Sequence, residues 1–193
     1  QVGVSYARDA EQDDNQQKNL DIYDDGVQSN ISDIVDVAAN YVNSFGAFDV
    51  ALSGRYGFAN DDSGGDPTVW GGGLNLGYAG FTIGGSYAEQ NGASFMNGQA
   101  WDAGVSYETG PWGFSFTYMN GENVDDETVG IAADGDEQLQ QYLLGVNYTL
   151  AKGVALNGFG AYADFDEDVS DGGAGGGNDV DGWVLGTGIK ISF

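Results

Sequence analysis

The stretch WVLGTGIKISF at residues 183–193 is the most informative segment of this 193-residue chain. In an extended strand, successive side chains point to opposite faces. One face here is apolar, with Trp183, Leu185, Ile189 and Phe193, whereas the other face holds small or polar residues such as Lys190. An apolar face ending in an aromatic residue is typical of a transmembrane barrel wall, where lipid contacts the outside and water or packed side chains contact the inside.

The composition excludes several classes of function. The chain has 30 acidic and 5 basic residues, a formal net charge of −25, so we expect no nucleic-acid partner. It has no cysteine for a disulfide or a thiolate site, and no histidine to act as a general base. We therefore expect no enzyme activity and no required cofactor. The sequence contains no run of about 18 apolar residues, so no transmembrane helix is predicted. A transmembrane barrel needs no such run, because only alternate residues of its strands contact lipid.

The two-residue period recurs along the chain and predicts ten strands, at 1–8, 33–43, 47–58, 68–78, 80–89, 99–108, 112–121, 138–149, 153–164 and 181–193. Short connections containing Gly or Pro alternate with long ones rich in Asp, Asn, Gly and Ser, at 9–32, 59–67, 90–98, 122–137 and 165–180. This alternation predicts an all-β, antiparallel up-and-down transmembrane barrel with one plain and one elaborated rim. We expect residues 1–193 to form a single domain.

Aromatic residues are expected to form two girdles on the lipid-facing side of the barrel. They stand at both ends of strand after strand: Trp70, Tyr78, Trp101, Tyr107, Trp112, Tyr118, Tyr142, Tyr148, Trp183 and Phe193. At a tilt near 40°, separations of six to ten residues span roughly 15–25 Å, close to the apolar band of such barrels. The alternative is a soluble β-protein that buries these rings in its core.

The opposite face is small and polar, and its charged residues are predicted to line a pore: Asp36, Asp49, Arg55, Asp102, Glu108 and Lys190. Charges are costly in a dry core but tolerated in a water-filled lumen. The strand at 153–164 fits this pattern worst, because the period places Phe159 inside and Gly158 and Gly160 outside. A β-bulge in this strand would restore the pattern, and we expect one there.

At this point the chain resembles the general diffusion porins of Gram-negative bacteria, most closely the alphaproteobacterial type. The resemblance covers the whole chain and rests on the serial order of four segments: GVSYARD at 3–9, NYVNSFGAFDVALSGRYGFA at 40–59, LNLGYAGFTIGGSYAE at 74–89 and VLGTGIKISF at 184–193. It implies an outer-membrane location, a sixteen-stranded barrel and a homotrimer. It also implies contact with lipopolysaccharide and recognition of the terminal Phe193 by the barrel-assembly machinery.

The ten predicted strands correspond to the last ten strands of such a porin. We therefore expect the chain to be the C-terminal portion of a longer polypeptide, and the alternative is a complete ten-stranded barrel filled mostly by side chains. In the resembling family, basic residues on the barrel wall set a transverse field across the pore. Arg55 matches that role, and the alternative is a simple ion pair with a neighbour such as Asp36.

Carboxylates cluster in two of the long connections and are candidate ligands for Ca²⁺: Asp125, Asp126, Asp134, Asp136, Asp164, Asp166 and Asp168. Hard cations take about six to eight oxygen ligands, which such clusters supply. An EF-hand is excluded, because Val169 replaces the turn glycine and Gly175 replaces the twelfth-position glutamate. The alternative is a set of solvated, mutually repelling loops.

These observations predict a water-filled channel for passive diffusion of small hydrophilic solutes and ions, with a preference for cations. Two alternatives remain open. One is a structural or adhesive outer-membrane barrel with a plugged lumen and acidic cation-binding loops. The other is a soluble, acidic all-β binding protein.

Overall fold

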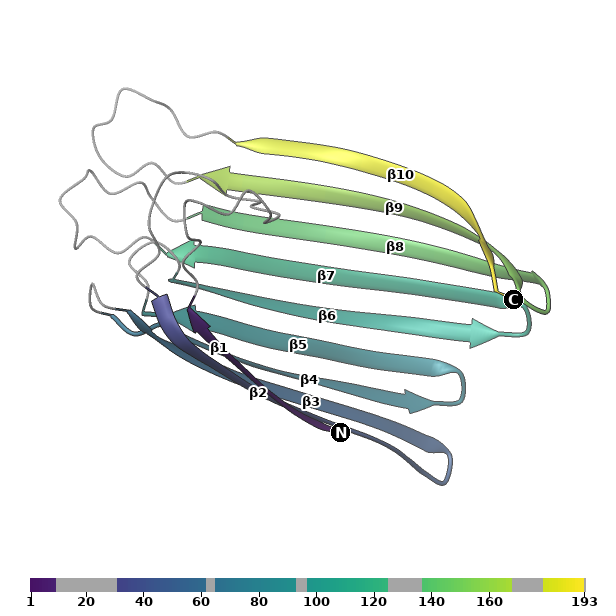
Figure 1. The fold of residues 1–193 in the computed structure, drawn as a ribbon. Helices are drawn as coiled ribbons and strands as arrows, with labels where there is room; N and C mark the ends of the chain where they lie inside the picture. The colour runs from purple at the N-terminus through teal and green to yellow at the C-terminus, as the bar shows by residue number, and fades with distance from the viewer. Residues whose placement is uncertain (10–30, 62–64, 93–96, 125–136, 168–178, 193) are drawn as a thin grey trace.

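The computed structural model describes residues 1–9, 31–61, 65–92, 97–124, 137–167 and 179–192, and they form one antiparallel sheet. The strands are long and run side by side (Figure 1). Their bounds are β1 Val2–Asp9, β2 Ile31–Phe45, β3 Phe48–Asp61, β4 Thr68–Tyr78, β5 Phe81–Asn91, β6 Asn97–Thr109, β7 Trp112–Val124, β8 Glu137–Ala151, β9 Val154–Glu167 and β10 Val180–Ile191. All ten predicted strands, and the up-and-down topology, are confirmed.

The strands extend further toward the long connections than the sequence predicted. For example, β3 continues to Asp61, β7 to Val124 and β9 to Glu167. Backbone pairing continues there, but the convex face is polar, with Asn60, Glu122 and Asp166, so the outward apolar period that reveals a strand has ended. The described residues contain no helix long and apolar enough to span a membrane.

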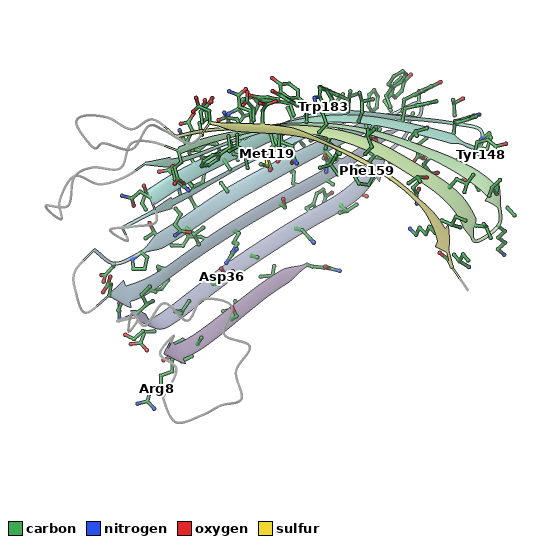
Figure 2. The ribbon with its side chains drawn as sticks, turned by 90° about the horizontal axis from the view of Figure 1, so that it is seen from above. Arg8, Asp36, Met119, Tyr148, Phe159 and Trp183 are labelled. Atoms are coloured by element: carbon green, nitrogen blue, oxygen red, sulfur yellow. The ribbon has the colours of Figure 1, made fainter. Side chains whose placement is uncertain are left out.

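Each strand pairs with the next one in sequence, so the sheet order is β1 to β10 without a crossover. In the described part of the chain, β1 and β10 are the two edges and do not pair with each other. The sheet curves strongly, and its concave and convex faces are evident when it is viewed from above (Figure 2). It therefore has the form of an open trough.

The cross-strand register assigns every side chain to one face, because directly paired residues point to the same side. Trp183 pairs with Tyr162, which pairs with Tyr142, which pairs with Tyr118. Figure 2 places Trp183 on the convex face and Phe159 on the concave face. The convex face is thus aromatic and apolar, as the period-2 pattern predicts for the lipid side.

The convex apolar residues are not covered by any other layer. Leu185 is 82% exposed and Trp183 is 75% exposed, and among the described residues the buried hydrophobic side chains are only those of Ala59 and Ala161. A soluble protein of this size would bury large apolar residues in a core. This sheet instead presents them outward, in the arrangement that a surrounding bilayer requires.

The turn between β4 and β5 is a two-residue hairpin turn formed by Ala79 and Gly80. Ala79 and Gly80 both have positive φ, 52° and 85°, the combination that a type I′ hairpin turn requires. Its twist matches that of the flanking strands, so Tyr78 and Phe81 come into direct register. The short connections at this rim therefore fix the alignment of the strands.

The bulge expected in the strand at 153–164 is not found in β9. The pairing of β8 with β9 is irregular between Thr149 and Ala151 of β8, opposite Ala155 and Val154. The register of β9 is unbroken from Ala155 to Glu167 against β8, and along its whole paired length against β10. Phe159 stays on the concave face, where it lies opposite Gly145 on one side and Gly186 on the other. Its ring extends over Gly186, where an added Cβ would approach Phe159 Cε1 to 2.1 Å. Gly186 makes room for the ring, so no register change is needed.

We predict that Gly186→Ala destabilises the barrel by about 1–3 kcal/mol, because the new methyl group overlaps the Phe159 ring. The measurement is the thermal transition of the native protein in detergent, followed by the shift between folded and unfolded gel bands. The matched control is Gly188→Ala on the same face, since a Cβ there meets nothing within 4 Å. The double variant with Phe159→Ala should recover most of the loss. Equal effects at 186 and 188 would contradict this packing.

The face assignment predicts the accessibility of two neighbouring positions in β4, Leu74 and Asn75. The sequence has no cysteine, so single substitutions introduce a unique thiol within it. In lipid bilayers, Asn75→Cys should react with a charged, membrane-impermeant thiol reagent at least about tenfold faster than Leu74→Cys, because only a hydrated thiol ionises readily. Labelling rates measured by mass spectrometry test this. The opposite order would mean that the faces are inverted.

Candidate functional site

Aromatic residues form a row on the convex face near the long-connection end of the sheet. Tyr162 lies between Trp183 and Tyr142, with ring centroids 4.7 and 6.3 Å apart, and Tyr142 contacts Tyr118 at 4.9 Å. The row continues through Trp101 against Tyr118 and through Trp70 against Tyr87, both at 5.1 Å. Aromatic side chains with an apolar body and a polar tip favour the membrane interface.

A second aromatic row lies at the short-turn end of the same face. Its ring pairs are Phe48 with Tyr78 at 4.6 Å, Phe81 with Tyr107 at 4.2 Å and Trp112 with Tyr148 at 4.5 Å. Leucine, isoleucine, valine and phenylalanine fill the convex face between the rows, as at Leu74, Ile83 and Leu144. Nine of the ten predicted girdle residues thus lie on one face in two rows; Phe193 lies outside the described residues.

Between the first aromatic row and the long connections, a chain of polar side chains crosses the convex face from β5 to β8. We call this chain the polar ladder. The Tyr87 hydroxyl lies 2.9 Å from both Glu89 and Gln99, and Gln99 donates to Glu122 at 2.9 Å. Gln138 donates to Glu122 at 3.2 Å, and Gln140 donates to Gln138 at 3.3 Å. These contacts tie four neighbouring strands together beyond the apolar band.

On the concave face, Arg55 and Asp36 form an ion pair across β3 and β2. Arg55 Nε donates to Asp36 Oδ2 at 2.6 Å, and the side chains are 60% and 20% exposed. Gly57, directly opposite Asp36, leaves the space for this contact, because a Cβ there would lie 3.0 Å from Asp36 Oδ2. The ion pair that the sequence left as an alternative is therefore present.

The other predicted pore-lining residues also lie on the concave face but are not gathered into one cluster. Asp102 accepts a hydrogen bond from Ser86, and Asp49 accepts one from Ser44 at 2.5 Å. Asp49, Glu108 and Lys190 are exposed near the short-turn end, on β3, β6 and β10. The charges are thus distributed along the wall, an arrangement that shapes the potential of a passage and does not form a catalytic constellation.

The concave face has two hollows of about 540 Å³ each. One lies over β1 to β5 and is lined by Asn40, Ser53, Arg55 and Ser86 among others. The other lies over β4 to β9 near the long connections and is lined by Gln90, Asn123, Glu137, Leu139 and Phe165 among others. A smaller hollow of about 180 Å³ adjoins the Arg55–Asp36 pair. The described cavities thus open on the side that the sequence assigned to the lumen.

The candidate calcium ligands are only partly described. Asp125, Asp126, Asp134, Asp136 and Asp168 lie outside the described residues. Asp164 and Asp166 belong to β9, where they pair with Gln140 and Gln138 and share their convex side. Within the described ranges, no group of three or more acidic side chains is arranged to hold a metal ion. The calcium site stays a prediction.

Sequence reasoning missed two features of the concave face. Glu137 was assigned to an acidic loop, but it is the first residue of β8 and pairs with Asn123 of β7. The inner face was expected to be small and polar throughout, yet on β8 to β10 it holds Leu139, Leu143, Phe165, Val180 and Val184. The alternation of β8, continued two residues back from Leu139, would have placed Glu137 on this face.

The Gram-negative porin family matches residues 1–189. Among solved structures, OccK10 (OpdN) of Pseudomonas aeruginosa aligns with a TM-score of 0.57 and 15% identity, over 86% of this chain and 54% of that one. The likeness to OccK10 concerns the fold, and the chain spans about half the length of that protein. No curated protein matches the chain. On the family match, the chain belongs to the Gram-negative porins and is a protein of the outer membrane.

Proposed function

We propose that this chain forms part of a water-filled channel through which small hydrophilic solutes and ions diffuse passively. The observation that supports it best is the division of one sheet into two unlike faces. The convex face has an apolar band between two aromatic rows, and most of the concave face is polar and hollowed. A sheet of this kind can form a wall between lipid and water. Diffusion of solutes along its hydrated face needs neither an energy source nor stoichiometric binding. It offers no catalytic arrangement, and we propose no enzymatic role.

Further strands are needed to close the barrel. In a bilayer, the free N–H and C=O groups along the outer edges of β1 and β10 would each cost several kcal/mol. We propose that strands from a longer polypeptide pair with both edges, giving a barrel of about sixteen strands that is wide enough for an aqueous pore. The chain spans 54% of the OccK10 chain, which agrees with such a remainder.

The intact mass of the polypeptide purified from outer membranes tests this closure. We expect a mass clearly larger than the 20.2 kDa of this chain, because ten strands leave two unpaired edges. A mass close to that of the chain would instead support a complete ten-stranded barrel, whose interior is filled mostly by side chains.

Charge on the described part of the concave face favours cations. Its carboxylates include Asp36, Asp49, Asp102, Glu108 and Glu137, whereas its basic groups are Arg55 and Lys190. A passage lined by one sign of charge concentrates the opposite ion. We therefore propose a cation-preferring pore, in which Arg55 and Asp36 together provide a local transverse field.

Replacing Arg55 with glutamine tests the electrostatic part of the proposal. Without its partner, Asp36 acts as an uncompensated carboxylate, so the cation-to-anion permeability ratio should rise about twofold at low salt. The measurement is the reversal potential across a KCl gradient in planar bilayers, and the difference should shrink toward 1 M salt, where the Debye length is about 3 Å. Lys152→Gln, in the short turn outside the wall, is the charge-matched control. An anion preference of the native protein would contradict the proposal.

A plugged structural or adhesive barrel is the second candidate. Stable ohmic conductance steps favour the channel, and silent insertion favours the plug. We further propose the partners of such porins for this chain: a homotrimer, lipopolysaccharide around the convex face, and recognition of Phe193 during barrel assembly. Binding of Ca²⁺ by the acidic connections belongs to the same set of proposals.

A further inference from the structure

The concave face of β8 to β10 has an apolar track, formed by Leu139, Leu143, Phe159 and Phe165. Leu139 and Phe165 are directly paired at the long-connection end, and Leu143 and Phe159 follow toward the middle of the strands. Leu139, Leu143 and Phe159 are 36%, 37% and 46% exposed. A group of large apolar side chains on a surface that otherwise faces water marks a contact site for another apolar group.

A carboxylate, that of Glu137, lies at the long-connection end of this track. Glu137 lies two residues before Leu139 on the same face of β8. Both line the hollow of about 540 Å³ over β4 to β9, together with Phe165 and Val69. Asn123 Nδ2 donates a hydrogen bond to Glu137 at 3.2 Å. Of the basic residues that the structure describes, Arg55 is paired with Asp36, Lys152 and Lys190 lie toward the short-turn end, and Arg8 is on β1. Glu137 is thus an available negative charge beside apolar side chains.

We propose that this hollow is a binding site for organic cations that carry an aromatic or alkyl group, on their way through the channel. The cationic group pairs with Glu137, and the apolar group lies against Leu139 and Phe165. The two positions are roughly 7 Å apart along the strand, comparable to the length of a benzylammonium ion. This proposal rests on the channel function proposed above and deepens it by naming a class of solute.

Charge complementarity selects this occupant. The excess of carboxylates over basic groups on the described wall disfavours an apolar anion, and a neutral apolar solute would leave Glu137 unused. A purely hydrophilic cation would gain nothing from the leucine and phenylalanine side chains. A cation with an apolar part uses both features, because burial of its apolar area adds to the attraction between opposite charges.

The test compares two probe cations on the native porin in planar bilayers. After KCl conductance is established, benzyltrimethylammonium or tetramethylammonium is added on the side of the long connections, and the concentration dependence of current reduction gives an apparent dissociation constant. We expect the benzyl compound to bind at least about fivefold more tightly. Glu137→Gln and Leu139→Ala should each weaken its binding about threefold or more.

Two matched controls isolate the site. Asp181→Asn removes a carboxylate from the convex face of β10, and Leu144→Ala removes a leucine from the convex face of β8. Both should leave benzyltrimethylammonium binding within about twofold, and a normal KCl conductance shows that each variant is folded. Equal affinity for the two probes, or loss of affinity in the controls alone, overturns the binding site while the channel stands. Absence of any conductance overturns the channel and the site together.

Discussion

Hydrocarbon offers no partner to a backbone N–H or C=O group, and this constraint determines the whole architecture. Every strand from β2 to β9 has a neighbour on both sides, so its backbone groups are paired within the sheet. An extended, fully paired strand has a side-chain period of two, so each strand contributes alternately to two faces. Once one face is given to lipid, the other necessarily lines whatever the curved sheet encloses.

The two faces of the sheet meet different demands with different residues. The lipid side needs bulk and an apolar surface, with amphipathic rings at the heights where lipid meets water. The inner side needs space, and glycine supplies it where other groups must approach closely. Gly57 admits the contact between Asp36 and Arg55, and Gly145 and Gly186 flank Phe159. The high glycine content is thus partly explained by the packing of the inner wall.

Much of the fold could be predicted from the sequence because the period-2 signal is strong wherever one face touches lipid. The strands, their order and their orientation follow from it, and so does the convex position of Trp70 or Tyr142. The signal fails beyond the lipid band, where the convex face becomes polar, and for that reason Glu137 was taken for a loop residue. The concave position of Phe159 was predicted. The glycine that accommodates its ring, Gly186, lies on the neighbouring strand β10, so only the register reveals it.

The candidate site was less accessible to sequence reasoning than the fold. The concave position of Asp36, Asp49, Arg55, Asp102, Glu108 and Lys190 follows from alternation alone. Which charges meet does not, because the Arg55–Asp36 contact depends on a diagonal across two strands and on the absence of a side chain at position 57. The apolar residues on the inner face of β8 to β10 are visible in the sequence of each strand. Only the cross-strand register shows that they adjoin one another and form one surface.

The polar ladder across β5 to β8 has a consequence for how this protein can change over time. Its hydrogen bonds, from Tyr87 through Gln99 and Glu122 to Gln140, hold the strand ends together below the long connections. The shape of the opening is then set by the strands themselves. Because these bonds lie within the sheet, sequence changes in the connections need not alter the spacing of the strands.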